Sequence, residues 1–167
     1  MEFPHVSHAL GVVHPICLER GANAEVWDEQ GQRYIDFVAG IGVLNLGHGH
    51  PRVQAAIQAQ LGKLTHSAFN ALPHRGYLDL AQALDTFVPV SYPLSCMLTN
   101  SGAEATENAL KLARARTDRT AVIAFDDAFH GRTLAALNLG GKVAPYKQRL
   151  GSLPGPVYHL PFPGPDS

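Results

Sequence analysis

The chain has 167 residues, of which 46% are hydrophobic and 16% charged, a composition typical of a globular protein with a buried core. Its formal net charge of −1 gives no basic excess that would favour nucleic acid or an anionic membrane as a partner. We expect neither a membrane span nor a secretory signal, because no apolar run is long enough for the first and the N-terminus lacks the basic start and apolar stretch of the second. The two cysteines, Cys17 and Cys96, lie far apart in the sequence, which favours free thiols and a cytoplasmic location.

The first fifty residues are predicted to be mostly β-structure. Residues 1–20 show little periodicity and are expected to form an irregular arm. Residues 24–28 and 33–37 carry alternating apolar side chains on either side of Gly31, which predicts a hairpin. Residues 39–50 are a loop rich in glycine and histidine.

Two amphipathic helices are expected next. Pro51 suits the first position of a helix, where the missing N–H has no intrahelical partner to lose. Val53, Ile57 and Leu61 then repeat at four-residue spacing and line one face. A second helix is predicted over residues 75–88, which have the same kind of apolar face.

The second half of the chain has the pattern of a parallel α/β domain. Residues 95–99 and 121–125 are apolar runs without alternation, as in strands that are buried on both faces of a parallel sheet. A helix predicted over residues 104–116 lies between them, so the order strand, helix, strand predicts a βαβ unit. Residues 140–156 are expected to be a loop, and residues 157–160 are a candidate third strand.

The turn between residues 95–99 and the following helix is a candidate phosphate site. Gly102 allows a ligand to approach the backbone, and the first N–H groups of a helix have no internal partner and lie at its positive end. Ser101 and Glu104 also have the spacing of a capping box. On this local pattern alone, an ordinary capped helix start is the favoured explanation.

The loop after residues 121–125 holds a second group of candidates. In open α/β sheets, ligands lie beyond the carboxyl ends of the strands, where both loops are expected. Phe129 offers a stacking surface, and Arg132 can hold a carboxylate through two parallel hydrogen bonds. Without the other loop, the favoured explanation is a core phenylalanine, a hydrogen-bonded His130 and a surface ion pair at Arg132.

Three segments together resemble one family. VWDEQGQRYIDFVAGIGVLNLGHGHP, TNSGAEATENALKLARA and AFHGRT occur in the order and spacing of class III aminotransferases, and the resemblance is closest to 4-aminobutyrate aminotransferases. These are pyridoxal 5'-phosphate (PLP) enzymes, so the resemblance implies an α/β chain that is the N-terminal portion of the PLP-dependent transferase fold type I. It implies a β-hairpin arm in the small domain over residues 1–50. Residues 51–167 would form an incomplete first part of the mostly parallel-sheet, PLP-binding large domain.

The resemblance also assigns cofactor-binding roles. Ser101, Gly102 and Ala103 match the loop that binds the PLP phosphate, mainly through backbone N–H groups. Phe129 matches the aromatic residue, often tyrosine, that stacks on the pyridine ring, and His130 follows it as in the family. A phenylalanine loses the hydroxyl of tyrosine but keeps the ring face, so stacking is expected to survive.

Two further residues match substrate contacts of the family. Arg132 matches the arginine that grips the distal carboxylate of an ω-amino acid or of glutamate, and Ile41 matches an apolar residue of the substrate pocket. Thr65 and His66 resemble a segment that approaches the partner of a homodimer. The resemblance therefore implies an amino donor, 2-oxoglutarate as acceptor, and a homodimeric enzyme.

A metal site is the rival interpretation of the histidines. His48 and His50, with His66 and His130, are possible ligands. No H-E-x-x-H motif or thiolate cluster accompanies them, and residues 47–51 match the family's G-H-x-H-P turn before a helix. We therefore expect no metal.

The lysine that holds PLP as a Schiff base in the family has no match in this chain. None of its four lysines follows a strand in the family's lysine context; they are Lys63, Lys111, Lys142 and Lys147. We therefore expect no catalytic residue here. Two interpretations remain: an N-terminal fragment of a transaminase, or a non-catalytic truncated module for binding or dimerisation. Residues 163–167 look like a loop cut in mid-course, which favours the fragment.

Overall fold

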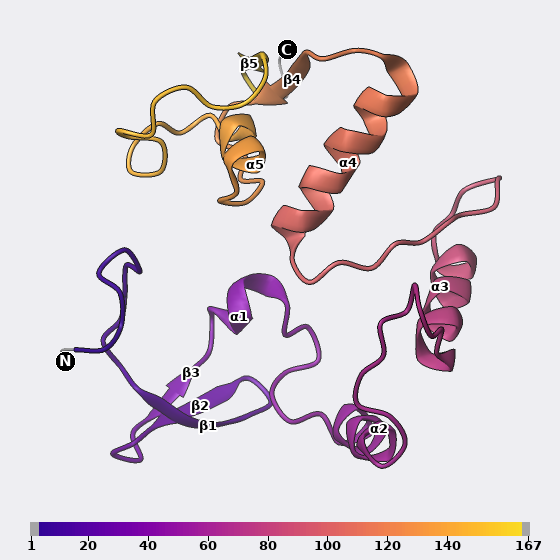
Figure 1. Cartoon of the computed structure of the whole chain (residues 1–167). Coiled ribbons are helices and arrows are strands. Elements are labelled where there is room, and N and C mark those ends of the chain that lie inside the picture. The colour runs from indigo at the N-terminus through magenta and orange to yellow at the C-terminus, as the bar shows by residue number, and fades with distance from the viewer. Residues whose placement is uncertain (1–3, 165–167) are drawn as a thin grey trace. The chain divides into compact units, whose positions relative to one another are not determined.

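The computed structural model describes residues 4–164 and divides the chain into two compact units, one ending at His74 and one beginning at Arg75 (Figure 1). The domain boundary that the sequence places near residue 50 stays a prediction. No helix within the described range is long and apolar enough to cross a membrane.

The first unit contains a small antiparallel sheet with strand order β1-β2-β3, followed by two helices (Figure 1). Its elements are β1 (Leu18–Ala22), β2 (Glu25–Asp28), β3 (Arg33–Ile35), α1 (Ala39–Gly42) and α2 (Pro51–Leu61). The predicted hairpin is confirmed as β2 and β3. The expectation of an irregular arm over residues 1–20 is wrong for residues 18–20, which belong to β1 and pair with β2. Their sequence lacks alternation, and pairing with a neighbour creates the strand: the Arg20 guanidinium lies 3.5 Å from the centre of the Trp27 ring across the two strands.

The carboxylate of Asp28 fixes the turn between β2 and β3. Its Oδ1 accepts hydrogen bonds from the N–H groups of Gln30 (3.0 Å) and Gln32 (2.8 Å), and its Oδ2 accepts one from the Tyr34 hydroxyl (2.8 Å). Burial raises the pKa of Asp28, but the bonds from Tyr34 and the two N–H groups outweigh it and leave that pKa below its ordinary value. Asp28 is therefore a buried structural anion whose hydrogen bonds offset its desolvation.

Helix α2 confirms the predicted start at Pro51. Its apolar face is uncovered: Val53, Ile57 and Leu61 are 42%, 53% and 59% exposed. These residues line an open groove of about 730 Å³. An apolar groove of this kind is typical of a surface that another element or chain covers.

The described part of the second unit, up to residue 164, contains three helices and a two-stranded parallel sheet, β4 beside β5 (Figure 1). Its elements are α3 (Arg75–Phe87), α4 (Gly102–Thr117), β4 (Val122–Phe125), α5 (Leu134–Leu139) and β5 (Val157–Leu160). Both predicted helices, the strand at 121–125 and the candidate strand at 157–160 are confirmed, and so is parallel pairing. The connection between the parallel strands contains α5, so the βαβ unit is β4–α5–β5 and not the predicted one.

The prediction of a strand at residues 95–99 is wrong for this chain, because this run pairs with no strand among the described residues. A strand requires a neighbour that satisfies its N–H and C=O groups, and β4 and β5 pair with each other instead. Side chains supply partners to this part of the backbone: the N–H of Leu98 donates to the Tyr77 hydroxyl (2.8 Å), and the N–H of Leu94 donates to Asp85 (2.6 Å).

The buried core of the described residues is small. Its apolar members are Val26, Ala124, Ala136, Leu137 and Leu139, and the last three belong to α5. The accessible surface is 13,678 Å², whereas a folded monomer of this mass exposes about 8,000 Å². Much apolar surface that a complete domain buries is therefore open to solvent.

Candidate functional site

The start of α4 is a capped helix terminus with two free donors. The Ser101 hydroxyl accepts a hydrogen bond from the Glu104 N–H (3.2 Å), and the Glu104 carboxylate accepts from the N–H groups of Ser101 (3.1 Å) and Asn100 (2.6 Å). The predicted capping box is therefore present. It leaves the N–H groups of Gly102 and Ala103 without a partner among residues 4–164.

Gly102 is not required by the fold of the described chain. A Cβ atom at this position would meet nothing within 4 Å, and the backbone does not adopt a positive φ there. The space beside Gly102 is open, and it lies at the positive end of a 16-residue helix whose first two N–H groups are free. An anionic group such as a phosphate fits this place.

Gly131 brings the second candidate loop against the start of α4. Its φ is +125°, and a Cβ atom there would lie 2.6 Å from the Cβ of Ala103 and 2.9 Å from its Cα. Glycine is therefore required at this position, both by the backbone conformation and by the close approach. The structure thus confirms that the segments around Gly102 and Gly131 lie side by side.

Glu107 forms a second connection between α4 and the segment that follows Gly131. Its Oε1 accepts a hydrogen bond from the Thr133 hydroxyl (2.6 Å) and from the N–H groups of Ala135 and Ala136 (both 3.2 Å). The bond from Thr133 is the main reason why the pKa of Glu107 lies below its ordinary value; burial opposes this, and the two N–H groups assist it. The carboxylate thus caps α5 and fixes residues 129–133 relative to α4.

Tyr146 lies between the aromatic and the cationic candidates. Its ring centre is 6.1 Å from that of Phe129 in an edge-on arrangement, and the Arg132 guanidinium is 5.2 Å from the Tyr146 ring centre. Phe129 is 64% exposed, so it is not a core residue, and Arg132 forms no ion pair within residues 4–164. Both side chains are therefore available to a ligand.

His130 and two lysines lie near this loop. The half-buried His130 lines a cavity of about 90 Å³ together with Phe129, Tyr146 and Lys142. Lys142 pairs with Asp127 at 3.5 Å, and the Lys147 ammonium donates to the carbonyl of Asn138 (3.3 Å). The absence of a Schiff-base lysine from this chain stays a prediction.

Ile41 lies in the first unit, in the short segment α1, whose backbone is a left-handed turn and not an ordinary helix. The φ angles of Ala39, Gly40, Ile41 and Gly42 are 45°, 61°, 61° and 84°. Left-handed backbone is disfavoured by about 1–2 kcal/mol for each residue other than glycine, so Ala39 and Ile41 together store about 2–4 kcal/mol. For a β-branched residue such a φ is rare. The Ile41 side chain is 91% exposed, so its own packing does not explain this conformation.

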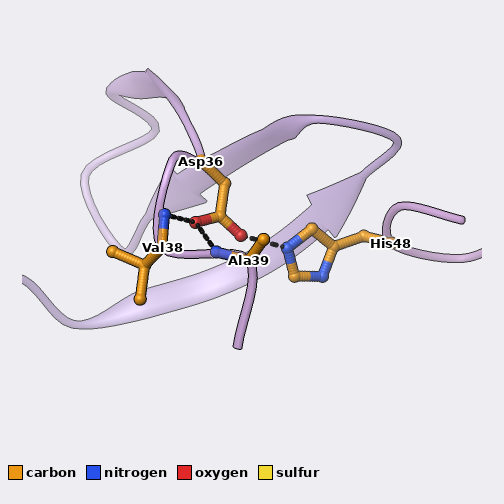
Figure 2. A network of polar contacts seen from close by, with 4 residues as sticks. All are labelled: Asp36, Val38, Ala39 and His48. Carbon is orange, nitrogen blue, oxygen red and sulfur yellow. Dashed lines mark hydrogen bonds and ion pairs between the residues drawn. The ribbon is translucent and has the colours of Figure 1, made fainter. Parts of the chain in front are cut away.

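A polar network holds this turn (Figure 2). Asp36 Oδ1 accepts hydrogen bonds from the N–H groups of Val38 and Ala39 (both 2.9 Å), and its Oδ2 lies 2.7 Å from His48 Nε2. The bond from Ala39 and then the contact with His48 lower the pKa of Asp36 from its ordinary value, against the opposing effect of burial. No group of three or more His, Cys, Asp or Glu side chains in the described part of the chain is placed to hold a metal.

Comparisons with known proteins agree with this geometry. The family described as aminotransferase class-III matches residues 7–167. The chain belongs to this family. The 2-aminoadipate transaminase of Pseudomonas putida is 68% identical over 162 residues, which are 97% of this chain and 39% of that protein. The 5-aminovalerate aminotransferase DavT of Pseudomonas aeruginosa is 48% identical (95% of this chain, 37% of that protein), and the 4-aminobutyrate aminotransferase GabT of Escherichia coli is 46% identical (96% and 38%).

Solved structures give the same result. A PLP-bound amine transaminase from an uncultivated Pseudomonas species superimposes with a TM-score of 0.86 at 27% identity, over 97% of this chain and 39% of that one. The predicted family and the fold, the N-terminal part of fold type I, are confirmed. The class III aminotransferase chain spans about two fifths of the length of the relatives it matches.

Three side chains of this aminotransferase chain hold candidate residues within their own units, Asp36 in the first unit and Glu107 and Tyr146 in the second, although nothing in the sequence assigned them this role. Asp36 and Glu107 lie within the segments that resemble the family, but their hydrogen-bond partners are distant in sequence. Tyr146 lies in a glycine- and proline-rich loop without any recognisable motif. Only a pattern of compensating changes across many relatives would have pointed to such residues from sequence.

Proposed function

We propose that the full-length enzyme containing this chain transfers the amino group of an ω-amino acid to 2-oxoglutarate with PLP as its cofactor. The observation that carries the proposal is the contact between Gly131 and Ala103. This contact places two free N–H groups, an exposed aromatic ring and an unpaired arginine on neighbouring segments. Relatives named for 5-aminovalerate and 4-aminobutyrate support this substrate class.

The residues present fit PLP. The N–H groups of Gly102 and Ala103 would hold its phosphate; the Ser101 hydroxyl, which accepts from Glu104, still has its own proton to donate. Phe129 would cover one face of the ring, and His130 follows it in the same loop and lines the same cavity. When bound, PLP supplies an electron sink for the electrons released at the amine-bearing carbon of the substrate.

Arg132 would orient the substrate by its distal carboxylate. Tyr146 supports the guanidinium from one side, and no protein carboxylate in the described range occupies it. A planar guanidinium binds a carboxylate through two parallel hydrogen bonds, which fixes the direction of the chain as well as its position. Ile41, in the first unit, would contact methylene groups of a substrate, as the family resemblance implies.

The chemistry of the candidate donors explains why one arginine can serve them all. 4-Aminobutyrate, 5-aminovalerate and 2-aminoadipate each carry a carboxylate at the end of the chain remote from the aminated carbon. 2-Aminoadipate is 5-aminovalerate with one more carboxylate on the aminated carbon, just as glutamate is 4-aminobutyrate with that addition. The identity of 68% with a 2-aminoadipate transaminase makes 2-aminoadipate the second candidate donor beside 4-aminobutyrate.

We also propose that the full-length enzyme is a cytoplasmic homodimer. The apolar groove along α2 offers a surface for a second subunit, and Thr65 is among the residues that line it. Cys17 and Cys96 are both free, as expected in a reducing compartment.

The test compares donors in the full-length enzyme and its Arg132→Ala variant, with glutamate formed from 2-oxoglutarate as the readout. The three amino acids are used beside pentylamine, which lacks a carboxylate. Loss of a charge-assisted carboxylate contact, worth about 1.5–3 kcal/mol, should raise KM for the amino acids about 10- to 100-fold and leave pentylamine unchanged. Arg119→Ala, at an exposed arginine beyond the C-terminal end of α4, is the matched control and should change neither. Equal losses for all donors would refute the role of Arg132, and absence of glutamate formation from every donor would refute the proposed reaction.

A further inference from the structure

The positive φ angles of the left-handed turn at residues 39–42 are not explained by the packing of its own side chains. Ala39 and Ile41 have positive φ angles although neither is a glycine or an asparagine. Ile41 gains no burial from this conformation, because 91% of it is exposed. Strained backbone persists only where its surroundings enforce it, and it concentrates where a side chain must be presented to a ligand.

Both ends of the segment that contains the turn are attached to the hairpin. The N–H of Asp36 donates to the carbonyl of Ala24 (2.9 Å), which anchors the beginning. At the other end, His48 and Asn23 exchange two backbone hydrogen bonds of 2.8 and 2.9 Å. The His48 ring also covers Gly21 so closely that a Cβ there would lie 2.6 Å from its Cγ. The hairpin and the two attached ends, at Asp36 and His48, therefore form a fixed frame for the turn.

The Asp36 carboxylate connects this frame to the turn (Figure 2). One oxygen receives the N–H groups of Val38 and Ala39, where the chain enters the turn, and the other contacts His48 Nε2 at 2.7 Å. The side chain of Asp36 is only 11% exposed and that of His48 26%, so solvent competes little for these contacts. No other described side chain accepts a hydrogen bond from the N–H groups that open the turn.

We propose that Asp36, held by His48, is a positioning residue that enforces the left-handed turn and so presents Ile41 to the methylene chain of the substrate. This inference rests on the proposed function for its substrate, but not for the mechanical link between Asp36 and Ile41. It predicts that Asp36 acts on selectivity through Ile41, without touching the substrate.

The first experiment measures this link by thermal melting of the full-length enzyme and needs no activity. Ile41→Gly removes the strain, because glycine adopts a φ of 61° readily. Asp36→Ala should therefore lower the melting temperature more in the Ile41→Gly background than in the wild type, where loss of the Asp36 bonds also releases the strain at Ile41. Equal decreases in both backgrounds would overturn the proposal.

The second experiment measures the ratio of kcat/KM for 4-aminobutyrate to that for 5-aminovalerate. Contacts with one methylene group discriminate by about tenfold or more, so Ile41→Gly and Asp36→Ala should each shift the ratio by about tenfold, and the double variant should shift it no further. Asp36→Asn keeps the oxygen that receives both N–H groups and should preserve most of the wild-type ratio. His48→Phe should keep a ring over Gly21 and shift the ratio in the same direction as Asp36→Ala.

Asp28→Ala is the matched structural control. Asp28 is also buried and hydrogen-bonded in the hairpin, but its partners are Gln30, Gln32 and Tyr34. It should lower the melting temperature and leave the ratio within about twofold of wild type. A ratio that moves equally in Asp28→Ala and Asp36→Ala would overturn the proposal. Coupled melting with no turnover of any ω-amino acid by the wild type would instead refute the proposed function and leave the Asp36–Ile41 link standing.

Discussion

Replacing Gly102 with valine separates the fold of the chain from the proposed phosphate contact. A Cβ atom at Gly102 meets nothing within 4 Å, and φ is not positive, so the substitution removes no packing and introduces no backbone strain. An exposed substitution of this kind changes the free energy of unfolding by about 0.5 kcal/mol or less. The melting temperature of the full-length enzyme should therefore stay near that of the wild type.

The same substitution should remove most of the affinity for the phosphate. The valine side chain would occupy the open space beside Gly102, next to the N–H groups of Gly102 and Ala103, which are the donors left free by the capping box. Two hydrogen bonds to an ionised acceptor contribute about 3–6 kcal/mol. Since about 1.4 kcal/mol corresponds to a tenfold change, the Kd for PLP should rise about 100- to 10,000-fold.

The assay is a spectroscopic titration of the apoenzyme with PLP and with pyridoxal, which has the same ring without the phosphate. Only PLP binding should weaken in Gly102→Val. Gly11→Val is the control, because a Cβ at Gly11 also meets nothing within 4 Å. Unchanged PLP affinity in a well-folded Gly102→Val enzyme would refute the placement of the phosphate, and a large fall in melting temperature would show that Gly102 serves the fold instead.

The remaining predictions concern the contacts around this loop. Gly131→Ala should destabilise the full-length enzyme by about 2–6 kcal/mol through strain and overpacking. Gly151→Ala, at a positive φ of 68° with open space around it, should cost only about 1–2 kcal/mol. Equal decreases in the free energy of unfolding, measured by denaturant unfolding, would contradict the close contact at Gly131. Tyr146→Ala should raise KM for 4-aminobutyrate about two- to fivefold by removing a cation–π contact, and Tyr146→Phe should not; steady-state kinetics decide. Because the pKa of Glu107 is lowered in the folded state, the stabilisation by its carboxylate is present above the ordinary glutamate pKa and is lost as pH falls through the folded value. Glu107→Gln should therefore have a lower melting temperature than the wild type at pH 7, and this temperature should fall less on acidification. Melting temperatures that fall in parallel with pH in both proteins would exclude this role. The 167-residue chain alone should aggregate, lack transaminase activity and form no lysine–PLP adduct that borohydride can trap, since it exposes 13,678 Å² of surface; a cooperative melt with a trapped adduct would favour a self-sufficient module.

Local patterns were enough to predict most of the elements. Helix α2 follows from Pro51 and a four-residue repeat, and β4 and β5 follow from short apolar runs. The errors fall where an element exists only through its neighbour. Residues 18–22 become a strand because β2 pairs with them, and residues 95–99 have the composition of a strand but no neighbour among the described residues. Helix α5 has only six residues, too few for a periodic signal.

The sequence by itself determined the family, the type of fold and the candidate residues, because these depend on residue types at short, fixed spacings. Only the tertiary structure decided which candidates lie together and what holds them. The contact of Gly131 with Ala103 and the hydrogen bonds that Glu107 accepts from Thr133 and from the start of α5 join residues that are more than twenty positions apart. The polar contacts by which Asp36 and His48 hold the turn at Ile41 likewise depend on backbone angles that no spacing of residue types specifies. Such contacts form when separate elements pack, so their geometry is a property of the folded chain and not of any local segment.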